Sequence, residues 1–130
     1  MVNFKFQWFN KEIGSPVVTI AEYGLLFNKA CVSVMQNPEY ILIGFDKDNF
    51  AIGINPLEEK TEGAFEFAER ERNGYVRINS RDFIRYITQY FPTKPKESLR
   101  CVARWEEDMG VLIVDLNQVI DEEDVRKDEA

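Results

Sequence analysis

Residues 24–28 read Gly-Leu-Leu-Phe-Asn, and this stretch decides the fold expected for the 130-residue chain. The glycine and its short apolar run lead through the asparagine into a short helical pattern and two further apolar runs, which end at Pro56. The same order returns from residues 74–79, Gly-Tyr-Val-Arg-Ile-Asn, to Leu116. A repeat of roughly 35 to 45 residues with short strands cannot bury its own apolar face, so two copies are expected to share one core.

The first unit, residues 17–56, is predicted to hold two hairpins on either side of a short helix. Two apolar runs flank the connection 21–24, where a glycine can adopt a positive φ. Asn28 is suited to cap the helix, and Asn37-Pro38 ends it. The polar turn 46–49 separates the later runs. The expected elements are strands at 17–20 and 25–27, a helix at 29–35 and strands at 40–45 and 50–54.

The second unit, residues 74–116, repeats this order with more charge. Asn79 stands three residues before Asp82, an approximate capping box that predicts a helix from Ser80. An apolar stripe of Phe83, Ile84, Ile87, Tyr90 and Phe91 supports the helix, which Pro92 and Pro95 should end. The remaining expected elements are strands at 75–78, 99–105 and 111–116, the last two joined by the turn 106–110.

The fold class expected from these patterns is α+β and β-rich. Two tandem units, each a hairpin, a short helix and a second hairpin, should form one swapped-hairpin-like barrel within a single compact domain, residues 1–120. Outside the repeat, the alternation of Phe4, Phe6 and Trp8 with polar residues predicts an extra N-terminal strand. Residues 121–130 carry eight charges and no aromatic side chain, so they should form a flexible acidic tail.

The composition argues against most enzyme classes. The chain has no histidine, which removes Ser-His and Cys-His nucleophile pairs and His-containing zinc sites. Cys31 and Cys101 lie among apolar neighbours, as buried thiols do, and two cysteines cannot complete a four-thiolate site. The seven glycines are scattered singly, so no phosphate-binding loop is indicated. We therefore expect a non-enzymatic protein without a cofactor or metal, and an uncommon carboxylate enzyme remains a third reading.

The sequence also lacks the patterns of membrane insertion or export. No segment approaches the roughly 20 apolar residues that a membrane-spanning helix needs. The first nine residues have neither a long apolar core nor a small-residue cleavage site. A cytoplasmic protein without a membrane partner is expected.

The run Val-Thr-Ile, the glycine turn, Leu-Leu-Phe-Asn, the short helix and the Tyr-Ile-Leu-Ile-Gly-Phe hairpin resemble the swapped-hairpin β-barrel of the AbrB and MraZ transcription regulators. The duplicated arrangement is closest to MraZ-like proteins, which carry two such units in one chain. The family usually has arginines around the helix start, where the first unit offers Phe27, Asn28 and Lys29, whereas residues 77–81, Arg-Ile-Asn-Ser-Arg, are nearer to that pattern. The resemblance thus implies DNA-contacting roles for Arg77, Arg81 and Arg85.

Charge is unevenly distributed along the chain. Residues 1–69 carry 5 basic and 10 acidic side chains, residues 70–104 carry 9 and 3, and residues 105–130 carry 2 and 10, within a net charge of −7. If the central cations meet on one surface, several phosphate contacts become possible. Alternatively, the arginines pair with nearby carboxylates and form an ordinary solvated face. The predicted nucleic-acid-binding residues are Arg70, Arg72, Arg77, Arg81, Arg85, Lys94 and Lys96, with Arg100 and Arg104 as further members of the basic segment.

Two functions follow as hypotheses. The first is a small regulator or nucleic-acid-associated protein that binds double-stranded DNA through the basic surface of the second unit. The second is a protein-interaction or assembly module of phage, mobile-element or antitoxin type, favoured by the net acidity and the abundant aromatic residues. A homo-oligomer is expected in either case. The acidic tail is read as a solubilising end, or as a segment that covers the basic stretch or binds a basic protein partner, as acidic extensions do in the related MazE-type antitoxins.

Overall fold

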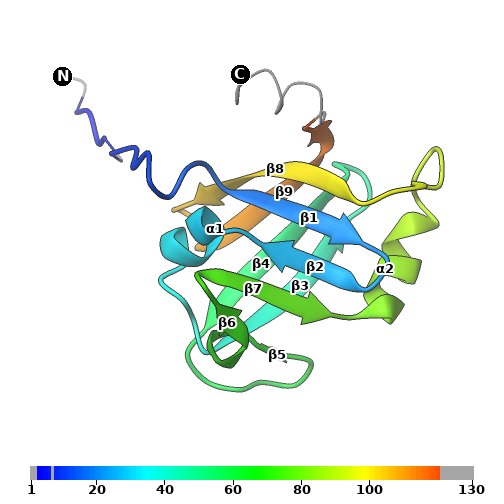
Figure 1. Ribbon diagram of the computed structural model, residues 1–130, viewed down its shortest axis with the longest axis horizontal. Coiled ribbons are helices and arrows are strands. Elements are labelled where there is room, and N and C mark those ends of the chain that lie inside the picture. The colour runs from blue at the N-terminus through cyan, green and yellow to red at the C-terminus, as the bar shows by residue number, and fades with distance from the viewer. Residues whose placement is uncertain (1–2, 7, 121–130) are drawn as a thin grey trace.

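The computed structural model describes residues 3–6 and 8–120, and within them the chain forms a nine-stranded antiparallel sheet with two short α-helices (Figure 1). The spatial order of the strands is β5-β3-β4-β9-β8-β1-β2-β7-β6. The elements are β1 (Val17–Ala21), β2 (Gly24–Phe27), α1 (Lys29–Val34), β3 (Tyr40–Asp46), β4 (Ala51–Leu57), β5 (Phe65–Glu66), the 3₁₀ turn η1 (Ala68–Arg70), β6 (Glu71–Arg72), β7 (Tyr75–Asn79), α2 (Arg81–Thr88), β8 (Leu99–Glu106) and β9 (Val111–Val119).

The sheet curls into a half-barrel. Figure 1 shows β8, β1, β2 and β7 in front of β9, β4 and β3. The edge strands β5 and β6 pair only with β3 and β7, respectively, and η1 joins them directly in sequence. A single stretch of eight residues, 65–72, therefore connects the two edges of the curled sheet.

The three predicted hairpins around glycine or polar turns are confirmed. β1 pairs with β2, β3 with β4, and β8 with β9, the last with a bulge between Cys101 and Ala103. Pairings between distant parts of the chain complete the sheet: β2 with β7, β1 with β8, and β4 with β9. The predicted β-rich character is thus correct.

The core fills the concave side of the curled sheet. In β1, β4 and β7, fully buried residues alternate with exposed or half-buried ones, as expected for strands with one face toward the core. Phe27 and Phe67 are fully buried and meet edge to face with ring centroids 5.3 Å apart. The Phe67 amide donates to the carbonyl of Glu39, so η1 is tied both to the core and to the start of β3.

Each α-helix begins at a side-chain cap. The Asn28 Oδ1 accepts from the Cys31 amide, which confirms the predicted cap of α1. In α2 the cap is Ser80, whose Oγ accepts from the Phe83 amide, so the predicted cap at Asn79 is wrong by one residue. Asn79 stays in β7, because that strand continues its pairing as far as Gly24. α2 buries Ile84 and Ile87 against the sheet.

The predicted N-terminal strand is wrong. Residues 3–6 and 8–10 belong to no strand, and Phe4, Phe6 and Trp8 are 75%, 67% and 85% exposed. The alternation of aromatic and polar residues is present, but this stretch pairs with no strand of the described chain. Period-two alternation indicates a strand only where a partner supplies the ladder of hydrogen bonds.

The two cysteines are buried and free, as predicted. Within the described residues, no helix has the length and apolar character required to cross a membrane. The predicted acidic tail, residues 121–130, lies outside the described residues.

Candidate functional site

The seven predicted cationic residues are all exposed, and they lie on consecutive elements of the second half of the chain. Arg70 lies in η1, Arg72 in β6 and Arg77 in β7, while Arg81 and Arg85 lie in α2. Lys94 and Lys96 belong to the connection between α2 and β8. We call these seven residues the basic surface.

Three surface hollows link the members of the basic surface. One hollow is lined by Arg70, Arg72 and Arg77, and a second by Arg77 and Arg81. The third is lined by Arg81 and Arg85 together with both lysines of the α2–β8 connection. Because Arg77 lines the first and second hollows and Arg81 the second and third, the hollows follow one another, with the second between the other two. Together they are lined by all seven predicted residues.

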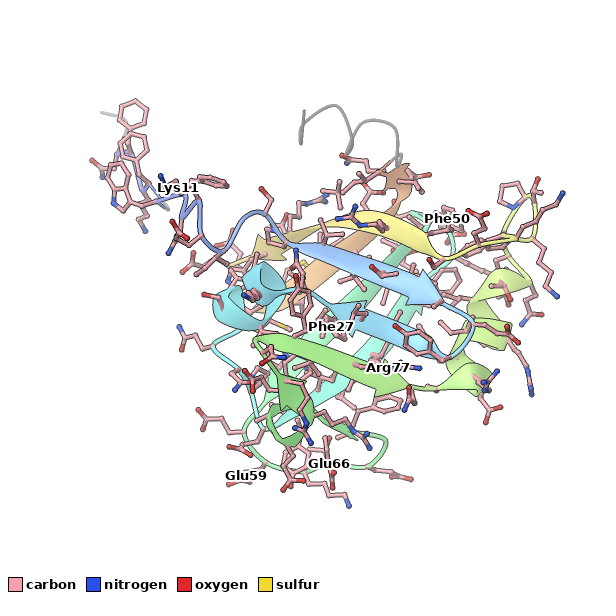
Figure 2. The ribbon with its side chains drawn as sticks, in the orientation of Figure 1. Lys11, Phe27, Phe50, Glu59, Glu66 and Arg77 are labelled. Carbon is pink, nitrogen blue, oxygen red and sulfur yellow. The ribbon has the colours of Figure 1, made fainter. Side chains whose placement is uncertain are left out.

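Arg77 is held at the centre of this surface. Its guanidinium carbon lies 3.5 Å from the centre of the Tyr23 ring, and its Nε donates to the Asn79 Oδ1 at 3.1 Å (Figure 2 labels Arg77). The pairing of β2 with β7 causes this contact, because it sets Gly24 opposite Asn79 and so places the β1–β2 turn beside Arg77. A guanidinium over an aromatic face keeps its in-plane N–H groups available to other acceptors.

Two members of the basic surface form exposed ion pairs. Arg81 lies 3.4 Å from Glu22, and Arg85 lies 3.7 Å from Asp82. The side chains are between 62% and 97% exposed, so each pair contributes at most about 1 kcal/mol and can exchange partners readily. Arg72 instead donates from Nη1 to the carbonyls of Glu69 and Glu71.

Acidic side chains accompany the cations. The carboxylates that line the same three hollows are Glu22, Glu66, Glu69, Asp82 and Glu97. Seven cationic and five acidic side chains line the three hollows, so positive charges outnumber negative ones on a surface of mixed sign. Its electrostatics favours a polyanion most strongly at low ionic strength, where screening of exposed charges is weakest.

The remaining two arginines of the basic segment lie apart from the basic surface. Arg100 and Arg104 are in β8, and Arg104 pairs with Glu106 at 2.9 Å and approaches Asp115 at 4.0 Å. The Asp115 pKa is lowered, mainly by the hydrogen bond that its carboxylate accepts from the Asn117 amide, with smaller contributions that include Arg104. The condition that the central cations meet on one surface therefore does not extend to these two, which line none of the three hollows, and Arg104 instead approaches Asp115 of β9.

A further hollow, of about 780 Å³, lies on the outer face of β3, β4 and β9. Gly44 and Gly53 lie opposite each other in its floor, and a Cβ on either glycine would meet no atom within 4 Å. We call this the glycine hollow. Sequence reasoning missed it, although a signal existed: counting outward from the turn between the two strands places the two glycines as cross-strand partners.

Tyr23, Asn79 and Ser80 also line the basic surface and were not predicted as site residues. No local pattern identifies them, since only the β2–β7 pairing brings the first hairpin turn to the start of α2. Among residues 3–6 and 8–120, no group of three or more Cys, Asp or Glu side chains is arranged to hold a metal ion.

Burial sets the chemistry of the two thiols. Desolvation raises the pKa of Cys31 to about 12, against hydrogen bonds with the backbone of Asn28 and Val17 that lower it. Desolvation also raises the pKa of Cys101 to about 11, with a smaller contribution from the charge of Asp115. Both thiols are therefore protonated at neutral pH, and neither lies on the basic surface.

Comparisons of the chain with protein-family models, with curated protein sequences and with solved structures give no match.

Proposed function

We propose that this protein is a small, non-enzymatic regulator that binds double-stranded DNA through the basic surface. The observation that supports the proposal is the sequence of three hollows linked by Arg77 and Arg81, which are together lined by cations spread over 27 residues of sequence, 70–96. A duplex presents two rows of phosphates, and exposed arginine and lysine side chains on one surface can replace their counterions.

The net charge of −7 does not prevent such binding. At physiological ionic strength the screening length is about 8 Å, so distant carboxylates act weakly on a phosphate at the surface. The nearby carboxylates Glu22 and Asp82 belong to exposed ion pairs. A phosphate can replace either of them at little cost, because exposed pairs contribute little free energy.

The proposal also assigns parts of the basic surface to different contacts. Arg77, fixed over Tyr23, can bind a phosphate or a base edge with little loss of side-chain entropy. Arg81 and Arg85 extend from adjacent turns of α2 and are suited to successive phosphates along one strand. These three arginines are the ones to which the AbrB and MraZ resemblance gives DNA-contacting roles.

We further propose that the half-barrel is a duplicated, swapped-hairpin unit. The strand pairing supports this: β1–β2, α1 and β3–β4 in the first unit correspond to β6–β7, α2 and β8–β9 in the second. The pairs β2–β7 and β4–β9 join equivalent strands, whereas β1 on β8 has no equivalent between β6 and β3, because β3 pairs with β5. Each unit thereby contributes strands to the other, as hairpin exchange requires.

The test is a salt series of duplex DNA binding. We expect the triple variant Arg77→Ala/Arg81→Ala/Arg85→Ala to lose detectable binding at moderate salt. At low salt the slope of log K against log salt should fall by about 3, one for each lost phosphate contact. Fluorescence anisotropy with a labelled duplex measures both quantities.

The matched control is Lys11→Ala/Lys47→Ala/Lys60→Ala, which removes the same amount of charge from exposed positions that line none of the three hollows. This control should keep most of the affinity and the wild-type salt slope. Absence of duplex binding by the wild-type chain at low salt, or equal losses in the two triple variants, would contradict the proposal.

A further inference from the structure

The N-terminal residues Phe4, Phe6, Trp8 and Phe9, here called the aromatic segment, are between 67% and 85% exposed. Three of the rings lie in sequence against one another, with centroids 5.8 Å apart for Phe4 and Phe6 and 5.5 Å apart for Phe6 and Trp8. None of them belongs to the buried core or to the side chains packed against it. Four large rings in one exposed stretch form an apolar patch of the kind that marks an interaction site.

The base of the aromatic segment is fixed, and it directs the segment away from the sheet. The amides of Ile13 and Gly14 both donate to the Asn10 carbonyl and close a turn. Asn28 then holds the following residues, because its Nδ2 donates to the Ser15 carbonyl and its Oδ1 accepts from the Val17 amide. Figure 2 shows Lys11 on a segment that projects beyond the body of the molecule, at the end opposite α2.

The same chain carries a receptor of matching chemistry. The glycine hollow has an apolar part, formed by Gly44 and Gly53 with Leu42, Val111 and Ile113, and polar side chains that include Asn49, Asn55 and Asn117 line the rest of it. The two glycines leave space that no side chain among residues 3–6 and 8–120 fills. Aromatic rings laid over paired glycines in a sheet restore the cross-strand packing that the missing side chains leave out.

Charge complements this fit. Asp46 and Asp115 line the glycine hollow, and hydrogen bonds, those from Asn49 and Asn117 first, lower the pKa of each. Both carboxylates are therefore ionised at neutral pH. One cation, Arg104, also lines the hollow and lies 4.0 Å from Asp115. Lys5, which stands between two rings of the aromatic segment, therefore complements the charge of Asp46 first.

We propose that the aromatic segment of one copy docks in the glycine hollow of a second copy and that this contact assembles the protein. A second copy is favoured over the segment's own hollow because the turn at residues 10–14 and the Asn28 contacts direct the segment outward. Exchange of segments between two copies would fill both hollows and close the assembly as a dimer. No residue of the basic surface lines the glycine hollow, so assembly and DNA binding are separable.

The experiment measures self-association by sedimentation velocity over a concentration series. We call Phe4→Ser/Phe6→Ser/Trp8→Ser the segment variant and Gly53→Leu the hollow variant. Each should self-associate at least about 30-fold more weakly than the wild type, which is the size expected for the loss of a central aromatic contact. Both changes are at exposed or open positions, so both variants should fold. Tyr75→Ser, which removes an exposed aromatic residue elsewhere, should leave association unchanged.

A mixture of the two variants separates this contact from other modes of assembly. The hollow variant retains its aromatic segment and the segment variant retains its hollow, so together they should form a 1:1 complex at concentrations at which each alone is monomeric. Self-association of Gly53→Leu at wild-type strength would show that the segments bind each other and would overturn the proposal.

Trp8 reports the same contact by fluorescence. With Trp105→Phe as background, Trp8 is the sole tryptophan, and its emission should shift to shorter wavelength as protein concentration rises. A wild-type chain that stays monomeric throughout would overturn the proposal, and so would a shifted emission that is independent of concentration, which would place the segment in its own hollow.

Discussion

Gly24 is a single position on which the pairing of the two halves of the chain depends. Its φ is +150°, and a Cβ there would collide with the Ile78 carbonyl oxygen and lie 2.8 Å from the Ser80 nitrogen. Both atoms belong to backbone that forms the end of β7 and the cap of α2, so neither can move aside easily. Glycine is required here for space as well as for backbone conformation.

We therefore expect Gly24→Ala to lower the free energy of unfolding by about 2 kcal/mol or more, because the new methyl group forces β2 and β7 apart. Urea denaturation followed by circular dichroism measures the change. The control is Gly53→Ala, where a Cβ meets no atom within 4 Å and the backbone is ordinary strand, so stability should hold or rise slightly. Equal effects at the two glycines would contradict this account.

At the same scale, the sequence identified the cations but not their surroundings. The sequence alone shows Arg77 as one of several arginines in a basic stretch. Its placement over Tyr23 depends on the pairing of β2 with β7, whose residues lie 49 to 55 positions apart in the sequence. No local pattern carries that information.

At the scale of elements, the link 65–72 is the part that joins the two edges of the sheet. Its strands have two residues each, so they owe their place to tertiary contacts and not to strand propensity. Phe67 supplies the main contact: its side chain is fully buried against Phe27, and its amide is bonded to Glu39. The bounds and pairing partners of these strands escaped prediction, because two-residue strands show no measurable periodicity.

Phe67→Ala is expected to destabilise the protein by about 3–5 kcal/mol, the usual cost of deleting a buried phenylalanine ring. The half-buried Phe65, in the same link, provides the comparison, and Phe65→Ala should cost clearly less. Thermal and urea unfolding of both variants test this. A loss at Phe67 no larger than that at Phe65 would mean that the link is dispensable to the core.

The longer hairpins and the helix caps, unlike the link 65–72, have signals in the local sequence. Asn28 before a helical stripe, and apolar runs on either side of the turns 21–24 and 46–49, are local signals of a few residues each. The structure confirms all three. The error at the start of α2 was one residue, because Asn79 and Ser80 are both good caps and only the β7 pairing decides between them.

At the scale of the whole molecule, stability should depend on pH at both ends of the range. The folded state raises the pKa of Cys31 and Cys101 above the ordinary value of 9.0, to about 12 and about 11. The unfolded chain therefore loses these protons first, and stability should fall as pH rises from about 9. The lowered pKa values of Asp46 and Asp115 act in the opposite sense, with stability lost as pH falls below their ordinary value of 3.8.

The double variant Cys31→Ala/Cys101→Ala isolates the contribution of the thiols. Its free energy of unfolding should decline less steeply than that of the wild type between pH 9 and pH 11, whatever its absolute stability. Urea denaturation at a series of pH values gives the two slopes. Parallel slopes would show that the buried thiols do not control the alkaline limb.

The sequence by itself determined the β-rich class, the hairpins with their turns, the cap of α1, the buried thiols and the list of cations. These features depend on local propensity, on alternation over a few residues and on charge, and each of these can be read from residues that are close in sequence. Only the tertiary structure decided that the aromatic segment pairs with no strand in the described part of the chain, that Arg104 lies apart, and that the basic surface adjoins Tyr23. Those outcomes depend on β2 pairing with β7 and β4 with β9, contacts between residues far apart in sequence whose partner choice is set by the packing of the whole core.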